Sequence, residues 1–244
     1  MRKLGGLVFA VIGSVAVAAP ATVGDYAMRA EPVAPGVYAV ITPARDFPNV
    51  ENRGWNSNST FVVNGDGVLV IDSGSSETIG RALRQVIAKV TDKPVRWIIN
   101  THGHGDHWLG NAALADSKTE IIASTTVRNR IEREGEEWVA RFNGMTDGAT
   151  GTSRVLKPNQ VYDARVAIAF GELKAELLPS GDGHSPGDLA VWLPQQKVLI
   201  GGDVLYTERA PATFDSKLPH WIAFLKELET LKPVKIVPGH GPVA

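Results

Sequence analysis

The chain has 244 residues, of which 43% are hydrophobic and 21% charged, and its formal net charge is -1 at pH 7. This is the composition of a soluble globular protein, and without any basic run it excludes the electrostatic footprint of a nucleic-acid-binding protein. The sequence contains no cysteine, which excludes a cysteine nucleophile, a thiolate metal ligand and a disulfide. A hydrophobic core must therefore stabilise the fold alone.

The first residues have the pattern of a cleaved secretory signal. A short basic start precedes an uncharged apolar run, and Ala16 and Ala18 stand in the A-x-A arrangement that precedes a cleavage site. An uncleaved membrane anchor is the alternative, but the run is shorter than the roughly 20 apolar residues that a spanning helix needs. We therefore predict a signal peptide over residues 1–21, cleaved near 18–21. The mature protein is expected to be periplasmic or secreted, without stable membrane insertion.

Hydrophobic runs separated by turn residues predict the elements in chain order. After a polar, proline-containing lead, single strands are expected over 37–42, 59–64, 67–74, 95–100, 119–125 and 234–240, and two hairpins over 166–180 and 188–203. Apolar residues recur at helical spacing, as Ile79, Leu83 and Val90 do, and predict helices over 76–90, 125–142 and 219–231. We expect one domain over 31–244, built of two mixed sheets covered by helices.

Histidine and carboxylate side chains recur where the predicted strands end. Three of the six histidines lie in one loop, NTHGHGDHWLGN (100–111), and glycines flank nearly every candidate, which lets the backbone turn tightly. The candidate ligands are His102, His104, Asp106, His107, His184, Asp203 and His240. One edge of the sheets is therefore expected to gather all seven.

This donor set fits zinc, because imidazole and carboxylate groups suit borderline divalent ions. Seven candidates exceed what one ion requires, so the sequence predicts two ions that share a bridging carboxylate and a bridging hydroxide. Manganese and iron are also compatible with a site that has no thiolate. We expect Asp72 to form a structural hydrogen bond or to hold a ligand, and His220 to be structural or to lie at the rim.

The segment THGHGDH, followed in order by GHSPGD, GGD and PGHG, resembles the signature of the metallo-β-lactamase superfamily over about residues 33–243. The resemblance implies an α+β fold, a four-layer αββα sandwich with metals at one edge. It implies that the first zinc is held by His102, His104 and His184, the second by Asp106, His107 and His240, and that Asp203 bridges the two.

The activity implied by the resemblance is that of a binuclear zinc hydrolase. Its substrate would be a small molecule, an ester, lactone, thioester or amide whose carbonyl is attacked by a metal-bridging hydroxide. Asp106 is the implied proton acceptor or orienting group. Two alternatives stay open: a genuine β-lactamase that hydrolyses β-lactam antibiotics, and a non-hydrolytic metalloprotein such as an iron-dependent sulfur dioxygenase or an accessory metal-binding factor. The sequence leaves the oligomeric state open.

Asp203 helps to identify which members of the superfamily this chain resembles. Secreted β-lactamases with one cysteine ligand carry that cysteine where Asp203 stands, and flavo-di-iron proteins replace the histidine at His104 with glutamate. Asp203 instead resembles the thioesterases and lactonases. Exported relatives with GHSPGD and a tryptophan in the last helix, as in HWIAFLKELETL, resemble the group associated with quinoprotein-relay or sulfur-oxidation systems.

Contacts with substrate are expected from outside the ligand set. The segment 41–59 is long, polar and rich in turn residues, so it is either a mobile flap over the metals or an ordinary connecting loop. Ordinary packing is the alternative for each candidate. The candidates are Phe47 and Trp55 in this segment, Asn111, which would orient the ligand loop, and Tyr206 and Arg209 just beyond Asp203.

Overall fold

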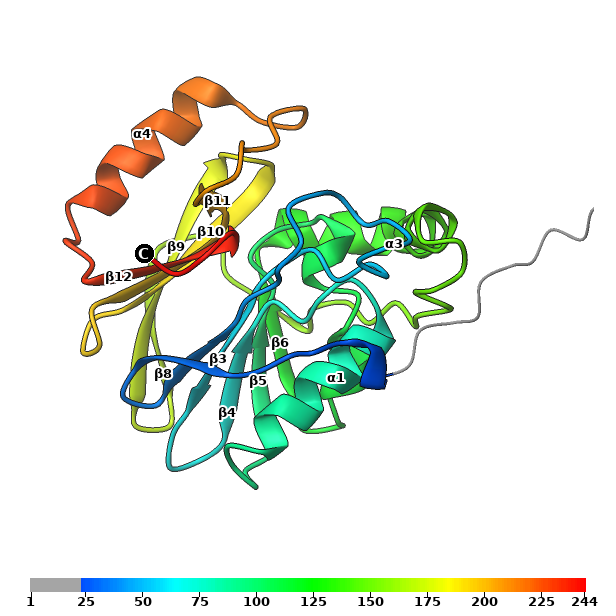
Figure 1. Cartoon of the computed structure of the whole chain (residues 1–244). Helices are drawn as coiled ribbons and strands as arrows, with labels where there is room; N and C mark the ends of the chain where they lie inside the picture. The colour runs from blue at the N-terminus through cyan, green and yellow to red at the C-terminus, as the bar shows by residue number, and fades with distance from the viewer. Residues whose placement is uncertain (1–22) are drawn as a thin grey trace, which may run out of the picture.

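The computed structural model describes residues 23–244, and the predicted signal peptide lies outside these described residues. Two β-sheets lie face to face with helices on the outside (Figure 1). Within the described range, the structure contains no helix that combines the length and the apolar character needed to cross a membrane.

The first sheet has seven strands in chain order. They are β1 (Glu31–Ala34), β2 (Val37–Val40), β3 (Ser59–Val63), β4 (Val68–Ile71), β5 (Val95–Ile99), β6 (Glu120–Ala123) and β7 (Gln160–Val161). The pairs from β1 to β4 are antiparallel and those from β4 to β7 are parallel, so the sheet is mixed, as predicted. Strands β3 and β4 form an antiparallel hairpin, in whose turn Asn64 Oδ1 accepts hydrogen bonds from the backbone N–H groups of Asp66 and Gly67.

The second sheet has five strands in the order β12-β11-β10-β9-β8. They are β8 (Val166–Phe170), β9 (Leu173–Asp182), β10 (Pro186–Leu193), β11 (Val198–Tyr206) and β12 (Lys235–His240). Both predicted hairpins are confirmed as antiparallel pairs, β8 with β9 and β10 with β11. β12 joins β11 in parallel, which makes this sheet mixed as well.

The main core lies between the two sheets. It contains residues of both, among them Leu69 and Ile99 from the first sheet and Leu177 and Val191 from the second. Helix α1 (Glu77–Ala88) packs through Ile79 on the other face of the first sheet. Helix α4 (Leu218–Glu229) covers the second sheet with Trp221, Phe224 and Leu228. The predicted four-layer αββα sandwich is therefore confirmed (Figure 1).

Helix α3 (Thr125–Met145) packs beside the histidine-rich loop. Its buried residues Val127, Ile131 and Trp138 form a cluster with Trp108 and Leu109, which belong to that loop. The Ser124 hydroxyl caps the helix by accepting a hydrogen bond from the Val127 N–H. The helix thus supports the loop from one side.

The structure differs from the predicted elements at four places. The polar lead forms β1, an edge strand that pairs only with β2, where Pro32 is tolerated. Helix α1 ends at Ala88, so Val90 lies outside it and is 36% exposed. The short elements α2 (Asn111–Leu114) and β7 were not predicted, because so few residues show no periodicity.

Candidate metal centre

The seven predicted ligands are all buried and lie together at one edge of the sheets. The loop after β5 carries four of them, partly in the 3-10 helix η2 (Gly105–His107). His184 lies in the turn between β9 and β10, and His240 ends β12. Asp203 departs from the prediction, because it lies within β11 at an irregular point of the β11–β12 pairing and not after the strand's end. A Cβ atom at Gly239 would lie 2.0 Å from Asp203 Oδ1, so only glycine leaves room for this carboxylate.

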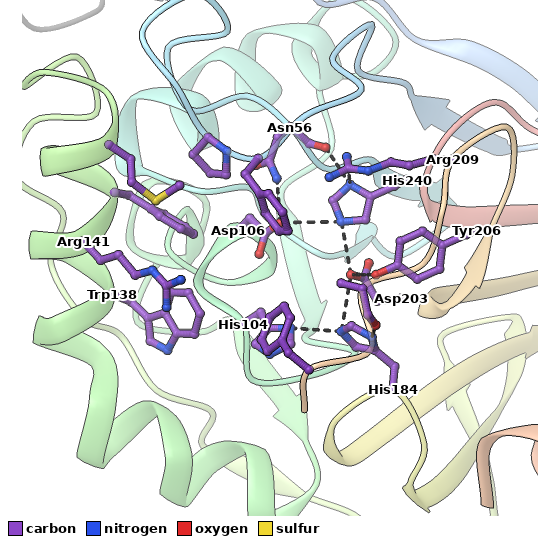
Figure 2. A pocket seen from close by; sticks show the side chains of 16 residues that line it. Asn56, His104, Asp106, Trp138, Arg141, His184, Asp203, Tyr206, Arg209 and His240 are labelled. Atoms are coloured by element: carbon purple, nitrogen blue, oxygen red, sulfur yellow. Dashed lines mark hydrogen bonds and ion pairs between the residues drawn. The ribbon is translucent and has the colours of Figure 1, made fainter. Parts of the chain in front are cut away.

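The first group of ligand atoms comes from three histidines and Asp203. His104 Nδ1 lies 3.1 Å from His102 Nε2 and 3.0 Å from His184 Nε2. Asp203 Oδ2 lies 3.5 Å from His184 Nε2 and 3.9 Å from His102 Nε2. Four donor atoms from three parts of the sequence therefore surround one point. Figure 2 shows three of the four residues, His104, His184 and Asp203.

The second group consists of Asp106, His107 and His240. Asp106 Oδ2 lies 3.6 Å from Nε2 of each of the two histidines. The Asp203 carboxylate reaches this group too, because its Oδ1 lies 3.2 Å from His107 Nε2 and its Oδ2 lies 3.1 Å from His240 Nε2. Asp203 thus stands between the two groups, which together fit a binuclear metal site.

Each of the five clustered histidines has its outer ring nitrogen beside a protein oxygen. His102 Nδ1 meets Thr101 Oγ1 at 3.0 Å, His104 Nε2 meets Asp215 Oδ2 at 3.3 Å, His107 Nδ1 meets Asp72 Oδ2 at 2.8 Å, His184 Nδ1 meets the Ala212 carbonyl at 3.1 Å, and His240 Nδ1 meets the Asn56 carbonyl at 2.7 Å. An outer N–H that donates to oxygen leaves the inner nitrogen with its lone pair, as a metal ligand requires.

Buried polar atoms at the centre show that the residues fit a cation. His107 Nε2 and Asp203 Oδ1 are buried, and neither has a hydrogen-bond partner. A buried polar atom left unpaired costs about 1–3 kcal/mol, which a bound cation would offset. Both atoms face the second group of ligands, where a metal would contact them.

The electrostatics of the site agree with this interpretation. Burial and the neighbouring His107 hold the pKa of His102 well below its ordinary value, and burial lowers the pKa of His184 to about 4, so both rings are neutral. Burial also lowers the pKa of His107, but the carboxylates of Asp203, Asp106 and Asp72 outweigh it and hold that pKa well above its ordinary value. The negative charges that favour a proton on His107 also favour a divalent cation at this point.

Asn56 is a site residue that the sequence did not single out. Its side-chain Nδ2 donates a hydrogen bond of 2.9 Å to Asp106 Oδ2, and its backbone carbonyl accepts the hydrogen bond from His240 Nδ1. The neighbouring Ser57 hydroxyl donates to the Asp106 carbonyl at 2.6 Å. The segment 41–59 therefore holds two ligands of the second group in place. Asn56 is one polar residue among many in this segment, and no pattern in the sequence marks it.

A pocket of about 470 Å³ lies above the two groups of ligands. Among the predicted substrate contacts, Phe47, Tyr206 and Arg209 line it. The Tyr206 hydroxyl donates a 2.6 Å hydrogen bond to Asp203 Oδ2, and burial together with Asp203 raises the pKa of Tyr206 far above its ordinary value, so this proton stays in place. Tyr206 therefore contacts a ligand as well as the pocket.

Three of the residues singled out in the sequence lie away from the pocket. Trp55 is buried in the core beside α1, edge-on to Tyr26 at 6.3 Å, and is not a pocket residue. Asn111 is buried as well, and it hydrogen-bonds Asn100, Ser73 and the Leu156 carbonyl behind the ligand loop, so it does not reach substrate. His220 is exposed on α4 and belongs to neither ligand group.

Other residues of the pocket wall were not recognised as such from the sequence. Trp138 and Phe142 lie on the buried face of α3, and both also line the pocket. Arg141 from the same helix and Phe214 from the segment between β11 and α4 complete the wall. Periodicity identifies the buried face of a helix, but it does not show which part of that face borders a cavity.

Asp72 holds a ligand, which was one of the two roles predicted for it. One of its oxygens accepts hydrogen bonds of 2.8 Å from His107 Nδ1 and the Thr101 hydroxyl, and the other accepts one from the Thr101 N–H. Its φ angle is +60°, which lies in the left-handed region. Aspartate and asparagine are both among the non-glycine residues that adopt this conformation most often. Asp72→Asn therefore keeps the backbone and removes the charge behind His107.

We expect Asp72→Asn to weaken metal binding at the second group by about 10- to 100-fold. Competition with a chromogenic chelator measures this affinity, and the melting temperature checks the fold. Asp66→Asn, a change in the exposed β3–β4 turn, is the matched control. Equal affinities for the two variants would show that Asp72 does not support the ligand.

Comparisons with known proteins agree with this geometry. A family model described as the metallo-beta-lactamase superfamily matches residues 52–240. A protein named beta-lactamase-like protein 2 homolog, from Caenorhabditis elegans, is 28% identical over 77% of this chain and 56% of its own length. A metallo-beta-lactamase type 2 from Bacillus sp. (strain 170) is 24% identical over 77% of this chain and 67% of its own.

Comparison with solved structures finds the same fold. The metallo-beta-lactamase from Pontibacter korlensis superposes with a TM-score of 0.70 at 22% identity and covers 89% of this chain and 93% of that one. At this identity the likeness concerns the fold alone. The family match spans most of the chain and all seven clustered ligands, from His102 to His240. The chain therefore belongs to the metallo-beta-lactamase superfamily, whose members are metal-dependent hydrolases.

Proposed function

We propose that this protein is a binuclear zinc hydrolase that cleaves the acyl C–O, C–S or C–N bond of a small ester, lactone, thioester or amide. The observation that carries the proposal is the position of Asp203 between the two groups of ligands. Asp203 belongs to the first group, and its two oxygens lie 3.2 Å and 3.1 Å from ligand nitrogens of the second. A site of two complete ligand groups joined by one carboxylate is suited to two-metal hydrolysis.

The residues that would hold the ions are those of the two groups. His102, His104 and His184 would hold the first zinc, Asp106, His107 and His240 the second, and Asp203 would bridge them. Two zinc ions supply Lewis acidity to a substrate carbonyl and lower the pKa of water from 15.7 to about 7. No side-chain nucleophile is then needed.

Asp106 is placed as a charged carboxylate that orients the reacting groups or accepts a proton from them. Burial opposes its ionisation, but His107 and His240 hold its pKa far below the ordinary value, so the carboxylate is charged. Asn56 Nδ2 fixes one of its oxygens at 2.9 Å, which directs the group toward the pocket that Asp106 lines.

Metal content and activity together test the proposal. Zinc-loaded protein is expected to contain two equivalents per chain and to hydrolyse members of a panel of chromogenic esters, thioesters and lactones, and chelation is expected to stop this until zinc returns. His184→Ala is expected to lose metal and activity, whereas His220→Ala, a change at the exposed histidine outside both groups, is expected to keep both. One equivalent at saturation, or oxygen consumption without hydrolysis of any panel member, would contradict the proposal.

A further inference from the structure

The pocket above the metal centre has an apolar wall formed by α3. Trp138, Phe142 and Met145 line this side, one to two helical turns apart. The Trp138 ring lies 5.6 Å from the ring of His104, so the wall begins directly beside the first group of ligands.

Two exposed aromatic side chains face this wall from the loops around the pocket. Phe47 is 55% exposed and Phe214 is 68% exposed, and both line the pocket. The Phe214 ring lies 5.5 Å from the His104 ring, so it stands over a ligand and not over the core. Large exposed aromatic residues gathered at one cavity favour a ligand with an apolar body.

The pocket also carries two arginines. Arg209 is already engaged, because its guanidinium lies 5.7 Å from the Phe47 ring centroid. Arg141 stacks on Trp138, with its guanidinium 5.1 Å from the ring centroid. Figure 2 shows Arg141 and Trp138 on one side of the pocket, opposite Arg209, His240 and Tyr206.

Arg141 differs from two of the three arginines that precede it on the same helix. Arg130 and Arg133 both form ion pairs with Glu134, and Arg130 also binds Asp215. Within residues 23–244, none of the ion pairs of the structure includes Arg141, whose planar face lies on a tryptophan and whose N–H groups are left for a ligand. A guanidinium is suited to bind a carboxylate or phosphate through two parallel hydrogen bonds.

We propose that the substrate of the hydrolase described above carries an anionic oxygen group at the far end of an apolar acyl or aryl body. Arg141 binds the anionic group, and the apolar body lies between the α3 wall and Phe214, with the scissile carbonyl at the two ligand groups. This inference rests on the proposed hydrolase function for the position of the carbonyl. The Arg141 side chain would then determine specificity at the end of the pocket away from Asp203.

Matched substrates test the role of Arg141. The pair consists of two thioesters of 3-phenylpropionic acid with the same leaving group, one with a para-carboxylate on the ring and one with a para-carboxamide. For the zinc-loaded protein, kcat/KM is expected to favour the carboxylate by about 10- to 100-fold, the effect of one charge-assisted hydrogen-bonded pair. Arg141→Gln is expected to bring the ratio of the two values close to one.

Arg133→Gln is the matched control, because it removes the same charge from the exposed face of the same helix. It is expected to keep the preference of the unaltered protein. If Arg133→Gln lowers the ratio of the two kcat/KM values as much as Arg141→Gln does, the preference for the carboxylate comes from the net charge of the helix and not from Arg141. The inference then fails. A ratio that is the same in Arg141→Gln as in the unaltered protein also overturns it.

Titration calorimetry separates this inference from the proposed function. Zinc-loaded protein is titrated with 4-phenylbutyrate, with the corresponding phosphonate and sulfonate, and with the neutral amide. The inference is supported if an anion binds more tightly than the amide, and if this difference is lost in Arg141→Gln and kept in Arg133→Gln. This result counts even if no thioester is hydrolysed. The anion that binds most tightly identifies the anionic group. Hydrolysis of both thioesters without any dependence on Arg141 leaves the hydrolase proposal standing and refutes the anion site.

Discussion

Replacing Asp203 with asparagine is expected to lower kcat/KM by on the order of a thousandfold, because the change removes several kcal/mol of the electrostatic stabilisation that a two-metal site supplies. Among the seven ligands, it is the one whose oxygens approach nitrogens of both groups, with His184 Nε2 of the first group at 3.5 Å and His107 Nε2 of the second at 3.2 Å. The imidazoles of His240, His107 and His102 outweigh burial and hold its pKa well below the ordinary value, so its negative charge is permanent. The neutral amide keeps the shape but not this charge.

The metal content of the variant shows whether Asp203 serves both ions. Elemental analysis of Asp203→Asn is expected to find less than one equivalent in total, whereas His240→Ala is expected to retain close to one, since it removes a ligand of the second group only. Circular dichroism and the melting temperature establish that both variants are folded. Two retained equivalents and unchanged activity in Asp203→Asn would show that the bridging assignment is wrong.

The ligands were predictable because the chemistry of a metal site leaves a strong pattern in the sequence. Five of six histidines stand at the ends of strands or in the turns between them, and the parallel order of β4, β5 and β6 brings the ends of these strands to one edge. Asp203 is the instructive exception, because it was predicted at the end of a strand and lies inside β11, which continues to Tyr206. An irregular pairing with β12 turns its side chain into the centre, and register irregularities leave no local signal in a sequence.

The rest of the pocket could not be predicted, because its residues have a second role. Trp138 and Phe142 occupy the buried face of α3, and Trp55 looked like a flap residue although it packs in the core. Arg141 reads as one more charge on a polar helix face until the structure shows it stacked on Trp138. Whether such a side chain is core, surface or pocket depends on the segments that pack against it, and these contacts are tertiary.

Thioesters and activated lactones are expected to be better substrates than β-lactams, by about two orders of magnitude or more in kcat/KM. Opening a β-lactam ring develops negative charge on the ring nitrogen, whereas a thiolate or an alkoxide leaves with less assistance. The Asp203 carboxylate, charged and held by the Tyr206 hydroxyl at 2.6 Å, places its own negative charge where that nitrogen must be stabilised. Loss of one well-placed electrostatic contact to developing charge costs about 10²- to 10³-fold.

The comparison is made on one zinc-loaded preparation, so that metal content cancels from the ratio. The values to compare are kcat/KM for nitrocefin and for the best members of a thioester and lactone panel. His220→Ala serves as a control for the preparation, because this exposed histidine touches neither ligand group and is expected to leave the ratio unchanged. A nitrocefin value higher by orders of magnitude would show that the carboxylate of Asp203 does not weaken stabilisation of the ring nitrogen. The protein would then be a β-lactamase that reaches high activity with aspartate at this position, and the charge argument would have to be abandoned.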